Sequence, residues 1–383
     1  MSPHSRWTGR RWRPPLLVAV LLALAPAARG GQAAAQLPAP AVSSPRPFHL
    51  GGYASLVVGR SHLGGRPAAD ELVEAAASLL VSGSVGRASY FGEFEPASRN
   101  RENWSGRFED RASSLERLYV EYAFTDALRL RLGRFLTPVG QWNELHAQPL
   151  TWTALRPLTT YRPFSKSTTG LMAAGSLPLG DHDSGYALYF APFNVGSEGQ
   201  ETSFTAAEGG RVAVELLPQL YLGVSALHFR ASRPLTPDSD FAITGPEGES
   251  SGVPGESDGE AGGREEDVGP RSLFGADASW SRGRTELLAE AIAVSASGER
   301  AAERGAFLQA ALPVPAVPAT YLVLRAERYG AVGRGTSSYL NIFTVGTRVR
   351  PLPHLTLKLD RQFTSRPSNR APDGWFLSAS ALF

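Results

Sequence analysis

The chain has 383 residues, with 40 glycines, 29 prolines and no cysteine, and a formal net charge of +2. The lack of cysteine excludes a disulfide framework and thiolate metal sites. Five arginines and no acidic residue lie in the first 35 residues, so the remainder carries 33 basic against 36 acidic residues and the positive charge gives no indication of nucleic-acid binding.

The first 35 residues predict a secretory signal peptide. An arginine-rich stretch is followed by the apolar run PLLVAVLLALAPA and then by small residues ending at Ala35. The run is too short to cross a bilayer as a helix, which needs roughly 20 residues. Arg10-Arg11 allows a twin-arginine signal as an alternative, but the residues after it fit poorly. We expect Sec export, cleavage before Gln36, and a periplasmic N-terminal segment over 36–47.

The rest of the chain is patterned for strands, because polar and apolar residues alternate in segments separated by turn residues. Helical periodicity is nearly absent. Sixteen segments of about ten residues, the length of a tilted membrane-crossing strand, are predicted: 48–59, 71–82, 86–95, 115–124, 128–136, 168–177, 184–192, 209–217, 219–231, 271–281, 284–295, 303–312, 318–330, 338–350, 354–364 and 374–383.

The connections alternate between short and long. Short ones include 125–127, 281–283 and 350–354, and long ones include 96–114, 137–167 and 232–270. A barrel that crosses a membrane sorts its connections in this way, with short turns on the periplasmic side and long loops outside. We therefore predict a transmembrane antiparallel β-barrel of about 16 strands over 48–383.

The alternation also predicts which side chains face lipid. Leu118, Val120, Tyr122 and Phe124 share one face, and the charged residues between them face a wet interior, since burying so many charges dry is costly. Sixteen strands leave an aqueous channel. The expected channel-lining residues are Arg117, Glu121, Arg129, Arg131, Arg211, Glu215, Glu286, Glu290, Arg325, Glu327, Lys358 and Asp360. Either they form ion pairs on the wall, or Arg117, Arg129 and Arg131 form a basic ladder.

Two stretches resemble known outer-membrane proteins. The terminal segment GWFLSASALF resembles the closing strand of bacterial outer-membrane barrels, whose final phenylalanine is recognised by the assembly machinery, and this implies that role for Phe383. LRLGRFLTPVGQWNE (130–144) is similar to the strand-to-loop passage of phosphate-selective porins. With the architecture of general sixteen-stranded porins, the resemblance implies a homotrimer and an inward-folded constriction loop at 137–167. The charged and polar residues expected in that loop are Asn143, Glu144, His146, Arg156, Arg162 and Lys166.

Segment 232–270 carries ten acidic residues against two arginines, with many glycines, serines and prolines, and we expect a mobile external loop. Its GESSG and GESDG match the GxSxG pattern of serine hydrolases, but that motif needs a strained strand-to-helix turn, so both matches are treated as chance. Asp181-His182-Asp183 falls in a predicted turn. No cofactor and no metal site are predicted.

Together these features predict a non-enzymatic porin of the bacterial outer membrane, which passes small hydrophilic solutes by passive diffusion. A mildly basic constriction would give a weak anion preference. The expected partners are the lipid bilayer, the barrel-assembly machinery and the solutes, with no nucleic acid. The alternatives are a substrate-specific channel, an outer-membrane barrel hydrolase and a secreted soluble β protein.

Overall fold

The computed structural model describes residues 48–62, 70–95, 98–101, 109–111, 114–145, 147–160, 163–179, 182–193, 203–234, 265–297, 301–332, 337–366 and 371–383. The expected signal peptide and periplasmic segment (1–47) lie outside the described residues. The strands are β1 (His49–His62), β2 (Asp70–Val85), β3 (Ala88–Glu95), β4 (Ser98–Arg101), β5 (Glu109–Arg111), β6 (Ser114–Thr125), β7 (Leu128–Leu136), β8 (Ser167–Leu179), β9 (His182–Ala191), β10 (Ser203–Leu217), β11 (Leu220–Pro234), β12 (Glu265–Arg282), β13 (Thr285–Val294), β14 (Ala302–Pro313), β15 (Thr320–Val332), β16 (Ser337–Leu352), β17 (Leu355–Thr364) and β18 (Asp373–Leu382). A 3₁₀ turn, η2, covers Leu158–Thr160. No helix in these ranges is long and apolar enough to cross a membrane.

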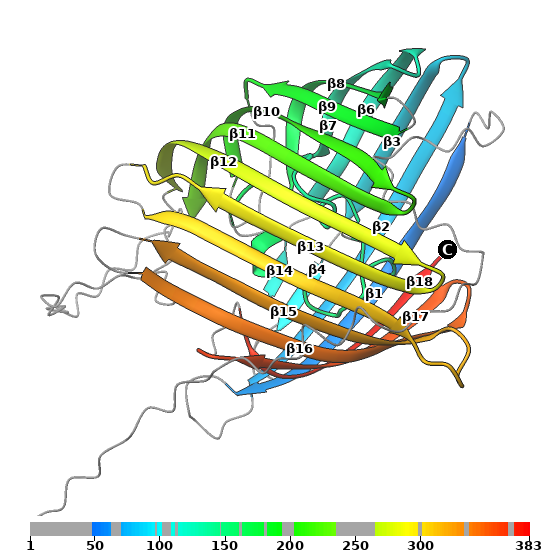
Figure 1. The fold of residues 1–383 in the computed structure, drawn as a ribbon, viewed down its shortest axis with the longest axis vertical. Coiled ribbons are helices and arrows are strands. Elements are labelled where there is room, and N and C mark those ends of the chain that lie inside the picture. The colour runs from blue at the N-terminus through cyan, green and yellow to red at the C-terminus, as the bar shows by residue number, and fades with distance from the viewer. Residues whose placement is uncertain are drawn as a thin grey trace, which may run out of the picture.

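The sheet closes on itself. Each long strand pairs antiparallel with its neighbours in the chain, β3 pairs with β6, and β1 pairs with both β2 and β18. Without the short strands β4 and β5, this gives a closed barrel of 16 strands, which confirms the predicted fold class (Figure 1). β4 and β5, in the connection predicted over 96–114, pair with each other, and β4 also pairs with β2.

The connections are sorted by length, as the sequence predicted. Two-residue turns at 86–87, 126–127, 218–219, 283–284 and 353–354 lie at one end of the barrel, here called the short-turn end. Gly86 and Gly283 take φ values of +59° and +61° there, a conformation that hairpin turns require and that glycine adopts without strain. The opposite end, here called the long-loop end, carries the segment between β7 and β8.

The two faces of the wall differ in chemistry. On the exterior face, Leu118 and Val120 are 55% and 57% exposed, whereas Glu121 on the interior face is 4% exposed. Leu132, Leu357 and Leu359 are likewise exposed on the exterior face. The side chains predicted to face outward and inward therefore do so in the structure. Because the barrel is closed, the backbone N–H and C=O groups of its strands are hydrogen-bonded to neighbouring strands, and an apolar exterior could not have paired them.

The bounds predicted for the segment 232–270 are wrong, and β10 begins at Ser203, six residues before the predicted start at 209. β11 continues to Pro234 and β12 begins at Glu265, so the ends of the segment 232–270 are strand and not loop. Ser232 and Asp267 are partners in the antiparallel ladder. The strand boundary was predicted from the end of the alternating apolar pattern, but the backbone pairing continues beyond that pattern. Residues 235–264, with both GxSxG matches, lie outside the described residues.

The interior of the long-loop end is apolar. Phe135, Phe229 and Tyr329 from the wall belong to one buried cluster that also contains Leu158 and Phe164 of the segment between β7 and β8. Each of these side chains is at most 2% exposed. Burial of such side chains stabilises by roughly 1.5–3 kcal/mol each, so the cluster holds this segment against the wall.

Candidate functional site: the barrel interior and segment 137–167

The wall of β6 and β7 carries the basic residues that the sequence singled out. Arg131 Nη2 is 2.7 Å from Glu121 Oε2, and Arg129 Nε is 3.9 Å from Glu121 Oε1. Arg117 Nε donates a 2.6 Å hydrogen bond to Glu93 Oε2, which is completely buried. Two arginines therefore share one carboxylate at Glu121, and this wall carries an excess of positive charge.

Aromatic rings fix the orientation of two of these arginines. The Arg117 guanidinium lies 4.4 Å from the centroid of the Phe91 ring, and that of Arg131 lies 4.1 Å from the centroid of the Tyr119 ring. The two rings stack on each other with their centroids 5.7 Å apart. Cation–π contacts of this kind are worth roughly 0.5–2 kcal/mol, so the two rings restrict the orientation of the two guanidinium groups.

Segment 137–167 crosses the interior to the opposite wall. Glu290 Oε1 on β13 accepts 2.7 Å hydrogen bonds from the backbone N–H groups of both Gln141 and Trp142. Gln141 Nε2 donates to Asp277 Oδ2 on β12 at 3.1 Å. Asp277 is also held by Arg211 on β10, at 2.6 Å. The Arg211–Asp277 pair thus supports the incoming segment.

The middle of the segment reaches the short-turn end. Pro149 O accepts hydrogen bonds from Arg348 Nη2 at 2.8 Å and from Thr356 Oγ1 at 3.3 Å. The indole N–H of Trp152 donates to Glu286 Oε2 at 3.0 Å. Glu286 and Thr356 are the second residues of β13 and β17, next to two-residue turns. Residues 149–152 therefore lie near the short-turn end, although the segment starts and finishes at the long-loop end.

Lys358 on β17 binds the same part of the segment. Its ammonium donates to Gln148 O at 2.6 Å, to Thr151 Oγ1 at 2.7 Å and to Thr153 O at 3.2 Å. Asp360 Oδ2, two residues further along β17, accepts a 2.6 Å hydrogen bond from the backbone N–H of Ala154.

The returning part of the segment is bound by β15. Arg325 Nη1 donates to Thr153 Oγ1 at 2.6 Å and to Leu155 O at 2.9 Å. Glu327 Oε1 accepts hydrogen bonds from the backbone N–H of Thr159 at 2.8 Å and from its hydroxyl at 2.9 Å. Backbone N–H groups at the start of the η2 turn have no partner within the turn, so a carboxylate there acts as a cap.

Eight of the twelve expected channel-lining residues fall into two groups; of the other four, Arg211, Glu286 and Glu290 bind the segment or its partners as described above, and Glu215 Oε1 accepts a 2.7 Å hydrogen bond from the backbone N–H of Gln219 in the adjoining turn. The first group forms ion pairs on the wall: Arg129 and Arg131 pair with Glu121, and Arg117 pairs with Glu93 of β3. Arg325, Glu327, Lys358 and Asp360 face the interior as well, but each is at most 4% exposed because segment 137–167 covers it. Hydrogen bonds to charged groups contribute about 1.5–3 kcal/mol each, so the second group serves to hold the segment.

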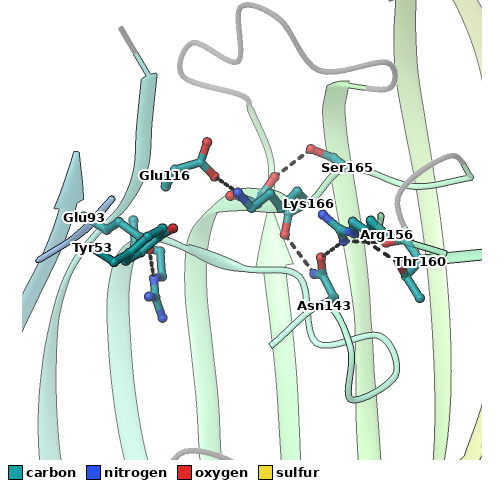
Figure 2. A network of polar contacts seen from close by, with 10 residues as sticks. Tyr53, Glu93, Glu116, Asn143, Arg156, Thr160, Ser165 and Lys166 are labelled. Atoms are coloured by element: carbon teal, nitrogen blue, oxygen red, sulfur yellow. Dashed lines mark hydrogen bonds and ion pairs between the residues drawn. The ribbon is translucent and has the colours of Figure 1, made fainter. Parts of the chain in front are cut away.

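A clasp closes the base of the segment (Figure 2). Thr137 N–H donates to Lys166 O at 2.9 Å, and Asn143 Nδ2 donates to the same oxygen at 2.9 Å. Arg156 Nη2 donates to Asn143 Oδ1 and to Thr160 O, both at 2.6 Å. Lys166, one of the residues expected in the loop, also forms an ion pair: its Nζ lies 2.6 Å from Glu116 Oε2 on β6.

Two of the expected loop residues, His146 and Arg162, lie outside the described residues. Glu144 lies in the space between the segment and the basic wall. It lines a cavity of about 110 Å³ with Arg117, Arg129 and Arg131. Burial raises the pKa of the Glu144 carboxyl to about 7, against the opposing influence of the Arg211 and Arg131 guanidinium groups.

Sequence reasoning missed several contributors to this site. Glu93, Asp277, Gln141 and Trp152 were not singled out. The parity of the strands places Glu93 and Asp277 inside, and this signal could have found them. Gln141 and Trp152 lie in segment 137–167, which has no alternating pattern from which the direction of a side chain could be predicted.

The final residue closes the seam of the barrel. Phe383 N–H donates to Gly52 O at 3.0 Å, and Gly52 N–H donates to Phe383 O at 2.9 Å. A Cβ at position 52 would lie 2.6 Å from Cζ of the Phe383 ring, so the ring covers β1 at a position where only glycine leaves room.

The described residues hold no group of three or more His, Cys, Asp or Glu side chains arranged to bind a metal ion. Asp181 of the Asp181-His182-Asp183 motif lies outside the described residues.

The architecture is that of the outer-membrane porins. OmpF of Salmonella typhi, solved with daunomycin, superposes with a TM-score of 0.57 at 12% identity over 88% of this chain and 97% of that chain. The anion-selective porin of Comamonas acidovorans gives a TM-score of 0.54 at 14% identity over 88% of this chain and 99% of that chain.

Pseudomonas putida OprB at high pH gives a TM-score of 0.56 at 10% identity over 88% of this chain and 94% of that chain. At such identities the likeness establishes the fold alone. No protein-family model and no curated protein matches the sequence.

Proposed function

We propose that the protein is a passive outer-membrane channel for small hydrophilic solutes, with a weak preference for anions. The observation that carries the proposal is the position of segment 137–167. It covers the charged residues of β12 to β17 and leaves the wall of β6 and β7, with Arg117, Arg129 and Arg131, facing the remaining space. The field of these arginines concentrates anions in a narrow aqueous passage with low-dielectric walls.

Segment 137–167 acts as the constriction in this proposal. Its contacts extend from the long-loop end to residues near the short-turn end, so the passage is narrowed along most of its length and not at one level. The proposal further includes export through residues 1–35, a periplasmic segment over 36–47, and recognition of Phe383 by the assembly machinery. It also includes a trimeric assembly, with a mobile acidic segment outside the membrane.

A substrate-specific channel is the second candidate. The observation that favours it is the firm hold on segment 137–167, whose backbone is bound by Glu290, Lys358, Arg325 and Glu327. A passage fixed in this way can select one solute by shape. A barrel hydrolase has no comparable support, and the proposal assigns no catalytic step to any residue.

Single-channel recording in a planar bilayer under a salt gradient tests the proposal. The reversal potential should indicate anion preference, and Arg129→Ala with Arg131→Ala should shift it toward cations. Arg60→Ala with Arg230→Ala is the matched control, because both arginines are exposed on the exterior face and the charge change is the same. Cation preference in the unmodified protein would refute the anion claim, and a small current blocked by one solute would favour the specific channel.

A further inference from the structure

Two arginines lie next to each other on the exterior face at the long-loop end. Arg304 is the third residue of β14, on the same face as Leu308, which is 50% exposed. Arg328 on β15 has neighbours Glu327 and Tyr329 that are 4% and 1% exposed on the interior face. Both arginines are exposed, and their side chains therefore project away from the barrel interior.

The register of the strands fixes their spacing. Arg304 is opposite Gly330, and Arg328 is opposite Ala306, so the two arginines are diagonal neighbours across β14 and β15. Diagonal neighbours of an antiparallel pair have side chains that start roughly 7–8 Å apart. Two guanidinium groups at this spacing can approach one phosphate group from opposite sides, and each can donate two hydrogen bonds to it.

Gly330 and Tyr339 complete the surroundings. Tyr339 on β16 is the ladder partner of Gly330, and a Cβ at position 330 would lie 2.7 Å from Cδ1 of its ring. The ring therefore lies over the glycine, and the Arg328 guanidinium stacks on it, 4.2 Å from the ring centroid. This contact orients Arg328 without neutralising it.

No acidic side chain of the described residues forms an ion pair with Arg304 or Arg328. Glu303 and Glu327, which directly precede the two arginines, both point inward: Glu303 binds Arg271 Nη1 at 2.7 Å, and Glu327 binds the backbone N–H of Thr159 at 2.8 Å. An arginine on a lipid-facing surface costs roughly 2–4 kcal/mol at the middle of a bilayer and close to nothing at its interface. Two unpaired, adjacent arginines are therefore best accommodated at the headgroup level, with an anion between them.

We propose that Arg304 and Arg328, with Tyr339 beside them, bind the phosphate headgroup of a lipid in the outer leaflet. The long-loop end faces the exterior of the cell in a barrel of this kind, which assigns the site to that leaflet. The site lies on the opposite side of the wall from the solute passage. It requires that the barrel span the membrane, but it does not depend on which solute passes or on the sign of the selectivity.

The test measures lipid binding by the purified full-length protein in a neutral detergent. The probes are a bis-phosphorylated glycolipid of the lipid A type, the same lipid after removal of its phosphates, and inorganic phosphate. We expect the phosphorylated lipid to bind at least tenfold more tightly than the dephosphorylated one. Arg304→Ala with Arg328→Ala should weaken its binding about 30-fold, from the attraction of two arginines near a membrane surface.

Arg60→Ala with Arg230→Ala is again the matched control and should leave binding within about twofold, since both changes remove exposed exterior arginines from other strands. Heat-modifiable gel mobility verifies that each variant forms a barrel. Equal weakening in the control variant would indicate general attraction and would overturn the site. Unchanged binding in the Arg304 and Arg328 variant would do the same.

Two further outcomes would also overturn the proposal. Displacement of the lipid by an equal concentration of inorganic phosphate would point to a soluble anion as the ligand. Loss of subunit association without loss of lipid binding would point to a contact between protein copies. In none of these cases would the salt-gradient measurement of the channel change, so failure of this site is distinguishable from failure of the proposed function.

Discussion

Replacing Lys358 by methionine should release the middle of segment 137–167. The ammonium is 1% exposed and donates to Gln148 O, Gln148 Oε1, Thr151 Oγ1 and Thr153 O at 2.6–3.2 Å. Methionine has a similar length and no donor. A simple sum at about 1.5–3 kcal/mol per hydrogen bond overstates the loss, because such contributions are not additive and because the lysine was itself desolvated.

The expected loss is about 3 kcal/mol, the upper end of the range for a hydrogen bond to a charged group and for a buried acceptor left without a donor. A loss of ~3 kcal/mol raises the population of released segment more than about 100-fold. Single-channel recording should then show larger and noisier conductance, and chymotrypsin should cut after Trp152 faster than in the unmodified protein, because Trp152 lies between two residues that Lys358 contacts. Lys166→Met removes the same charge at the base of the segment, where the contacts among Asn143, Arg156 and Thr160 remain, and should change conductance little. Unchanged conductance and unchanged protection from chymotrypsin at Trp152 in the Lys358 variant would refute the contacts described here.

Three further predictions concern other parts of the molecule. Gly140→Ala should loosen the start of segment 137–167 and raise the single-channel conductance. Gly140 has a φ of +65°, and a Cβ there would lie 2.3 Å from Glu290 Oε2. Thermal unfolding of this variant should also begin at a lower temperature. The anion preference, measured by reversal potential, should weaken as pH rises through about 7, because the Glu144 carboxyl is then deprotonated beside the basic wall, and Glu144→Gln should abolish this dependence. Because burial raises that pKa from 4.5 to about 7, the folded protein binds the proton more tightly than the unfolded chain does, and the contribution of this group to stability falls as pH rises from 4.5 to about 7. Deleting Phe383 removes both backbone hydrogen bonds to Gly52, so the fraction of heat-modifiable barrel should fall severalfold; an unchanged fraction would show that β1 and β18 close without it.

The barrel could be predicted because its signals are local. The strands alternate between side chains that face the exterior and side chains that face the interior, and turn residues mark the two-residue turns at the short-turn end. This is why all sixteen predicted segments correspond to strands, and why Arg129 and Arg131 were assigned to the correct face. The strand ends were less certain, since β12 begins at Glu265 in a stretch with no apolar alternation. At this end β11 and β12 remain paired through their backbones, although their side chains no longer alternate between apolar and polar.

The partners of the interior charges could not be predicted, because they depend on contacts far apart in sequence. Glu327 and Thr159 are 168 residues apart, and Asp360 and Ala154 are 206 apart. The sequence permits ion pairs along the wall as readily as bonds to a segment from another part of the chain. Only the three-dimensional path of 137–167 decides between them, and the η2 turn within it follows no periodic pattern.

The division of charges between the two walls has a physical cause that bears on selectivity. The segment offers backbone N–H and C=O groups, which are partial charges of both signs, so it binds carboxylates such as Glu290 and cations such as Arg325 without altering the net charge of that wall. On the wall of β6 and β7 the segment binds Glu116 through Lys166, whereas Arg129 and Arg131 share Glu121. The remaining positive charge, from Arg117, Arg129 and Arg131, therefore lies on a surface that borders the cavity. Any preference for anions should then depend on these few arginines and should be insensitive to substitutions among the buried charges opposite, provided that the segment stays in place.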